Sequence, residues 1–280
     1  YEIKGHDNYR YTKGFNIVGM VCLFVGIAIS LLIYNPVTGE VHSEFFFHFT
    51  PTGCSLLGTG LLYYLLCKPP YLVLGTHHSF TDFYVTPLAL FPHRANYVSE
   101  LEGFEYYGEW IYRQAGCLGT RKFIDDMGLI KNIKRVTDRG GILVLYPEAR
   151  YANVGTSSKL PMSVAKLVKM LKVPVVTLNM KGNYLQSPIW NLTKRKEARL
   201  HTDMTYALTT EDIRQMTTEE IYDKLSELLS YDEYQWQRDS KMKISYGNRA
   251  KGLHLPLYQC RNCKTEFSMD SNGSRIYCTC

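Results

Sequence analysis

Several features that would indicate nucleic acid binding or disorder are missing from this sequence. It has no dense block of lysine and arginine with interleaved aromatic residues, so nucleic acid binding is disfavoured. It has no internal repeats and no low-complexity linker, and its hydrophobic content of 45% excludes a disordered chain. The formal net charge of +6 is modest for 280 residues. That charge suits an anionic membrane surface or an acidic partner without requiring either.

The even scatter of cysteines that marks a small secreted disulfide scaffold is also missing. Two close thiol pairs, one Cys-x-x-Cys and one Cys-x-Cys, are typical of a closed tetrahedral zinc site. The Asn272-Gly273 pair between them is a hairpin turn signal. We therefore expect a reducing compartment and a small structural zinc ribbon over residues 254–280, with disulfides or a redox pair as the alternatives. The expected ligands are Cys260, Cys263, Cys278 and Cys280.

Charge is absent from two long runs near the N-terminus. Residues 15–34 are apolar, and at about 1.5 Å per residue they can cross a hydrocarbon core of about 30 Å, although a signal peptide is an alternative. Residues 45–67 are interrupted by histidine, proline and glycine, so they form either a second span or a re-entrant or interfacial segment. Lysine and arginine flank the two runs but are missing between them. This predicts a membrane hairpin in residues 1–70 with the rest of the chain in the cytoplasm; an apolar platform that does not cross is the alternative.

Beyond residue 70, short apolar runs alternate with helical stretches, which predicts an α/β fold with a largely parallel sheet. A capping box at Thr217-x-x-Glu220 predicts a helix that runs to about residue 230. We expect an α/β domain over residues 71–205 and a helical extension over residues 206–253. The expected strands are 71–74, 141–146 and 173–179, and the expected helices include 101–113, one with Ile130, Ile133 and Val136 on one face, and 163–172.

The first constellation of polar residues is His77-x-Ser79-x-x-Asp82, directly after an expected strand. In open α/β sheets, loops at the carboxyl ends of strands carry the chemistry. A neutral imidazole can take a proton from a hydroxyl, and a carboxylate on its other nitrogen fixes the tautomer. The same Ser79 and Asp82 also fit a capping box for a following helix, so both interpretations stay open. We expect His78 to pack against its neighbours or to face solvent.

Two further motifs place charges near expected strand ends. The strand at 141–146 is followed by Pro147, Glu148 and Arg150. An arginine in that place can bind a phosphate through two parallel hydrogen bonds. Arg121 lies in a stretch where cations follow Gly119. A surface ion pair and a solvated charge cluster are the respective alternatives.

In this order and spacing, the motifs resemble the lysophospholipid acyltransferase family, the 1-acyl-sn-glycerol-3-phosphate acyltransferases and their glycerol-phosphate relatives. The family's first motif, usually NHxSxxD, reads THHSFTD here, and the FPEGTRS-like third motif reads YPEARYA, with Ala149 in place of glycine. The GxxFIxR-like second motif is matched loosely by Gly119 to Asp126, with Asp126 where arginine is expected. The VPVVP-like fourth motif matches Val173 to Val176. The resemblance spans about residues 70–205.

The resemblance implies a glycerol-phosphate acyltransferase-like mixed sheet flanked by helices. It implies transfer of an acyl group from acyl-CoA or acyl-carrier protein to the free hydroxyl of a lysophospholipid, first of all 1-acyl-sn-glycerol-3-phosphate, which gives phosphatidic acid. His77 would be the general base and Asp82 its orienting partner, with no acyl-enzyme and no catalytic metal. Membrane lipids would be partners on the cytoplasmic side of the membrane. The implied substrate-binding residues are Ser79, Arg121, Pro147, Glu148 and Arg150.

Two alternatives from other classes stay open. The α/β domain can be an inactive binding module on a membrane-anchored zinc-ribbon adaptor. It can also be a metal-dependent hydrolase that uses His77, His78 and Asp82 as ligands, which chelators would inhibit.

Overall fold

The computed structural model describes residues 69–91, 93–121 and 126–280. The two apolar runs expected to form a membrane hairpin, residues 15–34 and 45–67, lie outside the described residues. Within the described residues, no helix combines the length and the apolar character that a membrane span needs. The chain divides into two compact units. The account below concerns the unit formed by Lys68–Thr86 and Ala95–Cys280.

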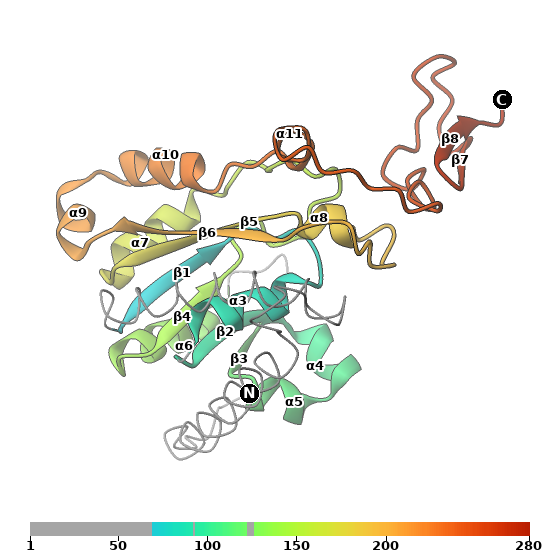
Figure 1. The fold of residues 1–280 in the computed structure, drawn as a ribbon. Coiled ribbons are helices and arrows are strands. Elements are labelled where there is room, and N and C mark those ends of the chain that lie inside the picture. Colours follow the sequence, from blue (N-terminus) through green and yellow to red (C-terminus); the bar gives the residue numbers. More distant parts are fainter. Residues whose placement is uncertain (1–68, 92, 122–125) are drawn as a thin grey trace, which may run out of the picture. The chain divides into compact units, whose positions relative to one another are not determined.

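A six-stranded sheet forms the centre of this unit, with the strand order β3-β2-β4-β1-β5-β6 (Figure 1). All neighbouring strands in it are parallel except β5 and β6, which are antiparallel, so the sheet is mixed as expected. The central strands β1, β4 and β5 are almost entirely buried. The strands are β1 (Tyr71–Gly75), β2 (Ala95–Glu100), β3 (Cys117–Thr120), β4 (Ile142–Leu145), β5 (Val175–Lys181) and β6 (His201–Leu208).

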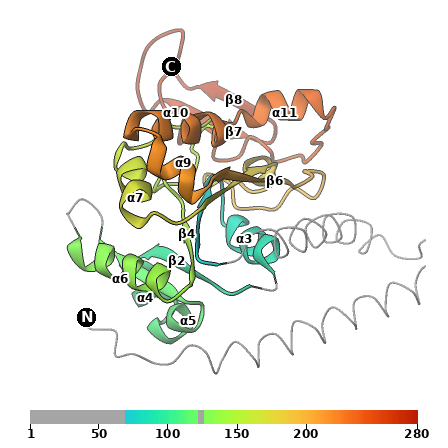
Figure 2. The same ribbon diagram turned by 90° about the vertical axis from the view of Figure 1, so that its left-hand side faces the viewer.

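One face of the sheet is covered by helices that share a hydrophobic cluster with it (Figure 2). Leu72 of β1 lies beside Leu143 of β4 and Val175 of β5, so these three side chains point to the same face. Ile133, Val168 and Leu225 from three different helices pack in that cluster. The covering helices are α6 (Met127–Asp138), α7 (Ser163–Leu171), α9 (Thr210–Gln215) and α10 (Thr218–Leu228).

The remaining helices are short and lie in the connections. The helix α3 (Asp82–Leu90) follows β1, and α8 (Asn183–Gln186) follows β5. The expected helix over 101–113 is interrupted, because Gly108 takes φ of 99° and separates α4 (Leu101–Tyr107) from α5 (Glu109–Gln114). The last helix is α11 (Glu233–Asp239).

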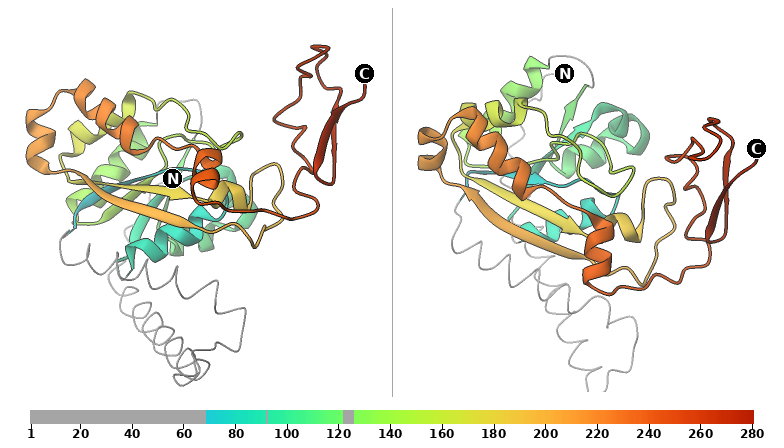
Figure 3. Two further views of the ribbon diagram at one scale, coloured as in Figure 1. Left: turned by 45° about the horizontal axis from the view of Figure 1, so that its top comes forward. Right: turned by 90° about the horizontal axis from the view of Figure 1, so that it is seen from above.

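The C-terminal end of the chain forms a separate two-stranded sheet, drawn in red in Figure 3. Its strands are β7 (Met269–Asn272) and β8 (Arg275–Cys278), which pair in antiparallel register. The turn between them contains Gly273 with φ of 57°, so the hairpin predicted from Asn272-Gly273 is confirmed.

Candidate active site

The candidate site lies in the loop at the carboxyl end of β1, between the two strands that flank it. Thr76 continues the pairing with β5, because its N–H donates to the Leu178 carbonyl oxygen (3.0 Å) and its hydroxyl accepts from the Met180 N–H (2.9 Å). The chain then turns, and His77 comes to face the first residue of α3. His77 Nδ1 lies 2.9 Å from Asp82 Oδ2. The spacing of five residues therefore brings imidazole and carboxylate together, as the sequence predicted.

Asp82 is fully buried, and donors surround its carboxylate. Besides His77, Oδ2 accepts from the N–H groups of His78 (2.7 Å) and Ser79 (3.0 Å). Oδ1 accepts from the Asn183 side-chain amide at 2.7 Å. Four donors replace the hydration that the buried carboxylate loses. The geometry is compatible with both interpretations left open by the sequence, since one carboxylate accepts from the N–H groups of the turn and also holds the histidine.

Aromatic rings fix the plane of the His77 imidazole. Tyr146, directly after β4, stacks on it with ring centroids 4.4 Å apart and an interplanar angle of 17°. Tyr151 lies on it at 4.2 Å and 35°. Burial raises the pKa of Tyr146 well above its usual value, so its hydroxyl stays protonated, and it pairs with Thr86 Oγ1 at 2.8 Å. The Ala152 N–H also donates to the His77 carbonyl oxygen (2.8 Å), which ties the β4 loop to the β1 loop.

The loop after β4 carries the second expected group. Pro147 is buried, and Ala149 takes φ of 53°, a left-handed conformation that favours glycine. Glu148 Oε2 accepts from the Ser158 hydroxyl, from the Ser158 N–H (3.2 Å) and from the Tyr231 hydroxyl (3.2 Å). Glu148 Oε1 is buried without a hydrogen-bond partner. One oxygen of this carboxylate is thus anchored and the other is buried without a partner.

The expected arginines differ in how close they lie to the dyad. Arg150 is exposed and directly precedes Tyr151, whose ring lies on His77. Arg121 is exposed and follows β3, which stands three positions from β1 in the sheet. At about 4.8 Å per strand, that separation is about 14 Å. The fold therefore brings Arg150 toward His77 but not Arg121. Ser79 is buried, and its Oγ accepts from the Thr81 N–H (3.2 Å).

His78 packs inside as one of the two expected alternatives, against the Tyr231 ring at 4.0 Å, but its partners and Asn183 were not predicted from the sequence. His78 is fully buried, and its Nδ1 lies 3.4 Å from Glu233 Oε1 of α11. Glu233 in turn accepts from the Gly182 N–H (2.8 Å), just before α8. Asn183, which holds Asp82, comes directly after Gly182. The signal that could have identified Asn183 is its place just beyond the carboxyl end of β5, the strand beside β1.

The four C-terminal cysteines converge on one point. Their sulfur atoms lie within 4.8 Å of one another, and the Cys263 and Cys278 sulfurs are 3.7 Å apart. A tetrahedral zinc site with Zn–S bonds of about 2.3 Å places its sulfurs about 3.8 Å apart. The Cys263–Cys278 distance matches this value, while the Cys280 sulfur lies closer, at 3.0 Å from Cys278 and 3.1 Å from Cys263. Within the described residues, this is the group of His, Cys, Asp and Glu that meets metal-site geometry. His77, His78 and Asp82 do not form such a group there, so the donor arrangement gives the metal-dependent hydrolase no support.

Comparison with known proteins agrees with the motifs. Residues 59–181 match the family model described as Acyltransferase, which covers every strand from β1 to β5. This part of the chain therefore matches an acyltransferase domain, in agreement with the predicted class of enzyme. No curated protein matches the chain. Among solved structures, the chain is similar to the 1-acyl-sn-glycerophosphate (LPA) acyltransferase PlsC from Thermotoga maritima, with 13% identity, a TM-score of 0.46, and coverage of 79% of this chain and 94% of that one.

Proposed function

On the basis of this acyltransferase domain, we propose that the chain transfers a fatty acyl group from a thioester donor to the free hydroxyl of a lysophospholipid. The proposed donor is acyl-CoA or acyl-carrier protein. The proposed acceptor is 1-acyl-sn-glycerol-3-phosphate, and the product is phosphatidic acid. The single observation that carries the proposal is the His77–Asp82 pair at 2.9 Å in the β1 loop of that domain.

The chemistry follows from the orientation of His77. The Asp82 carboxylate can only accept, so His77 Nδ1 carries the proton between them and Nε2 is the basic nitrogen. Nε2 takes the proton of the acceptor hydroxyl while its oxygen attacks the thioester carbonyl carbon. The carbon–sulfur bond then breaks, and the leaving thiolate takes the proton from the imidazolium. The buried Asp82 stabilises the imidazolium between these steps.

This route needs no acyl-enzyme, and the surroundings of Ser79 and of Cys117 support that. Ser79 Oγ accepts a bond from the Thr81 N–H, while His77 Nδ1 is occupied by Asp82. Burial raises the pKa of the Cys117 thiol to about 11, so it is a weak nucleophile at neutral pH.

The acceptor's glycerol and phosphate would bind beside the dyad. The free oxygen of Glu148 is suited to a hydroxyl of the glycerol, and Pro147 shapes that loop. The exposed guanidinium of Arg150 is suited to an anionic head group. We retain Ser79 and Arg121 as proposed substrate-binding residues, with Arg121 serving a part of a substrate that lies further from the dyad. The proposed location is the cytoplasmic side of a membrane, held there by residues 1–70.

We propose a structural zinc ion for the C-terminal module of residues 254–280. Four cysteine ligands close the coordination sphere, so the ion would hold the module's fold together and would not take part in acyl transfer. The divisions at residues 71–205 and 206–253 are likewise our proposal for the catalytic domain and its helical extension.

The deciding experiment is an acyl-transfer assay on membranes that contain the protein, with acyl-CoA or acyl-carrier protein as donors. Lysophosphatidic acid, other lysophospholipids and glycerol 3-phosphate serve as acceptors. We expect His77→Ala to lower activity by about 10²–10⁴-fold, the usual contribution of a general base. The matched control is His201→Ala, because His201 also pairs with an aspartate at 2.9 Å but is exposed. If neither the wild type nor the mutant transfers an acyl group to any of the acceptors, the inactive binding module would be favoured instead.

A further inference from the structure

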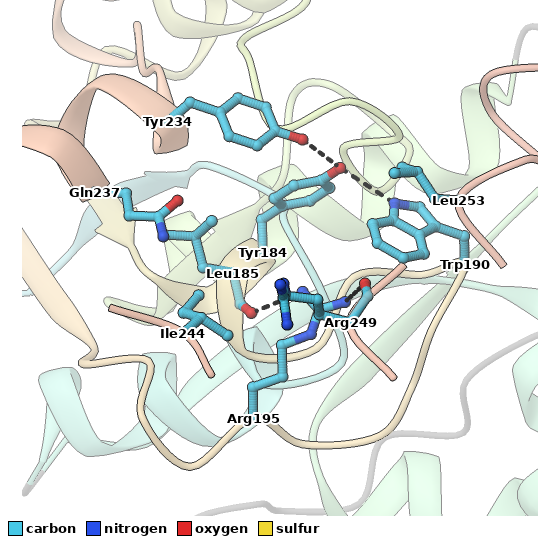
Figure 4. A pocket seen from close by; sticks show the side chains of 9 residues that line it. All are labelled: Tyr184, Leu185, Trp190, Arg195, Tyr234, Gln237, Ile244, Arg249 and Leu253. Atoms are coloured by element: carbon cyan, nitrogen blue, oxygen red, sulfur yellow. Dashed lines mark hydrogen bonds between the residues drawn. The ribbon is translucent and has the colours of Figure 1, made fainter. Parts of the chain in front are cut away.

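A cavity of about 290 Å³ lies beside α8 (Figure 4). Asn183 of α8 holds Asp82, while the next two residues of the same helix line the cavity. The other walls come from the loop after α8 and from the chain in and after α11. None of these positions carries a motif that the sequence analysis used. The lining residues are Tyr184, Leu185, Trp190, Arg195, Tyr234, Gln237, Ile244, Arg249 and Leu253.

Hydrogen bonds between side chains make the aromatic wall of this cavity rigid. The Tyr184 hydroxyl accepts from Trp190 Nε1 (3.1 Å) and pairs with the Tyr234 hydroxyl (3.1 Å). Burial is the main cause that raises the pKa of Tyr184 well above its ordinary value, so this hydroxyl is neutral at any physiological pH. The wall therefore brings no negative charge, and its apolar rings lower the local dielectric constant. A low dielectric constant strengthens any charge interaction inside.

Arg195 is a buried cation without a balancing anion. Only 5% of the residue is exposed, and its guanidinium lies over the Trp190 ring at 5.1 Å. Its Nη1 and Nη2 donate to the backbone carbonyl oxygens of Leu185 (3.0 Å) and Arg249 (2.9 Å), but Nε is buried with no partner. Desolvation lowers the pKa of Arg195, because holding this charge away from water costs free energy.

The other charges around Arg195 do not remove that cost. Among the described residues, Arg195 forms no ion pair with a carboxylate, and Glu197 is an acid whose charge acts on it. The Glu197 carboxylate is held by the Ser245 hydroxyl at 2.9 Å. The second charged group of the lining, Arg249, is also a cation, and no aspartate or glutamate lines the cavity. Two guanidinium groups facing one rigid, partly apolar space make a site that favours an anion.

We propose that this cavity binds the phosphate group of a substrate. Its size is at the lower end of ligand pockets, which suits a phosphorylated head group or the nucleotide end of a carrier and not a fatty acyl chain. The phosphorylated adenosine of coenzyme A is the source of that phosphate, because the acceptor's phosphate is assigned to Arg150 beside the dyad. The inference rests on the proposed function for its choice of substrate, but the anion site itself rests on the residues of the cavity alone.

The test is direct binding to the full chain, measured by isothermal titration calorimetry with two probes. Adenosine 3′,5′-bisphosphate represents the donor, and glycerol 3-phosphate represents the acceptor. Arg249→Gln removes one cation from the cavity, and because Arg249 is exposed the fold should tolerate the change. Lys251→Gln is the matched control. Lys251 lies two residues after Arg249, is also exposed and does not line the cavity, so its replacement removes the same charge outside the site.

We expect at least one probe to bind, with affinity about tenfold weaker in Arg249→Gln and unchanged in Lys251→Gln, as loss of one charge-assisted contact predicts. This pattern with adenosine 3′,5′-bisphosphate supports the donor as the source, whereas the same pattern with glycerol 3-phosphate alone would overturn that assignment. Absence of binding by both probes, or equal affinities in wild type and Arg249→Gln, would overturn the proposal. The binding assay does not involve turnover, so the two proposals can fail separately. If no acyl transfer is detected but binding depends on Arg249, the enzyme function is rejected and the anion site is retained.

Discussion

At the scale of single residues, Asp82 is the group on which the site depends. Its two oxygens accept four hydrogen bonds, from one imidazole, two backbone N–H groups and one amide. Each of these donors points at a negative charge. A neutral residue of the same shape would present its own N–H groups to some of them, so the arrangement requires a carboxylate.

Asp82→Asn tests this requirement. The amide can no longer hold the Nδ1–H tautomer of His77 or stabilise the imidazolium, so we expect kcat to fall by about 10²–10⁴-fold. The matched control is Asp203→Asn, because Asp203 pairs with His201 at the same 2.9 Å but in a half-exposed position on β6. That control should keep its activity and change stability by less than about 1 kcal/mol. Similar activities for the two variants would contradict the role given to Asp82.

Cys117 gives a prediction from its protonation state. Burial raises its pKa from 9.0 to about 11, so at pH 8 its thiolate fraction is about 100-fold below that of an unshifted thiol. We expect iodoacetamide to label the Cys117 peptide about 100-fold more slowly than a model thiol at pH 8, with labelling that rises up to pH 11. Mass spectrometry of the digested protein measures this rate. Labelling as fast as the model thiol would show a reactive cysteine and remove one support for direct acyl transfer.

At the scale of elements, α8 links the candidate site to the C-terminal part of the chain. Gly182 begins the turn into α8 with φ of 87°, and its N–H donates to Glu233 of α11. A side chain at this position has no room, since a Cβ would lie 1.9 Å from the Arg199 carbonyl oxygen. The position of Asn183, and through it that of Asp82, thus depends on a glycine outside the dyad.

Gly182→Ala should therefore lower both stability and activity. The clash is with backbone, which cannot rotate away, and the positive φ adds strain, so we expect a loss of about 2 kcal/mol or more in the free energy of unfolding. Gly247→Ala is the control, because a Cβ there meets nothing within 4 Å. It should change stability by about 0.5 kcal/mol or less. Thermal unfolding of the two variants decides the matter, and a Gly182→Ala protein as stable as wild type would be incompatible with this packing.

The elements that could be predicted from the sequence are those with a distinctive pattern of neighbouring residues. The buried strands β1, β4 and β5 are continuous apolar runs, and α10 begins with the reciprocal capping box predicted at Thr217 and Glu220. The strands β2, β3 and β6 were missed because they are partly polar and only half-buried, so their side chains show no apolar run. Pairing with neighbouring strands, which depends on distant residues, makes them strands.

The same reasoning explains the candidate site. His77, Ser79 and Asp82 lie within six positions, so one turn of chain brings them together. Asn183 lies 101 residues from Asp82 in the sequence, and Tyr231 lies 83 from Glu148. Contacts of that kind depend on the order of strands in the sheet, and no local pattern in this sequence encodes that order.

At the scale of the whole molecule, the C-terminal module is joined to the segment that lines the proposed anion site. The Ala250 N–H donates to the Gly273 carbonyl oxygen and the Gly252 N–H to Ser271 Oγ, both at 2.9 Å. Arg249 and Leu253 belong to that same segment and line the cavity. The β7–β8 hairpin alone is marginally stable in water, because two short strands bury little apolar surface. A metal bound by the four cysteines would therefore stabilise the hairpin and, through it, one wall of the cavity.

Removal of the metal should destabilise the C-terminal module and leave the α/β domain folded. We expect purified protein to contain about one zinc ion per chain, and a strong chelator to make residues 254–280 sensitive to protease while the α/β domain melts as before, because bound metal supplies the folding free energy of such modules. Cys263→Ser should act like the chelator, and Cys117→Ser, which changes a cysteine outside the cluster, should not. Since the hairpin supports the segment that carries Arg249, the metal-free protein should also bind the phosphate probe more weakly while His77 and Asp82 remain paired. Metal-free protein that resists protease throughout residues 254–280 would mean that the cysteines do not hold the module together.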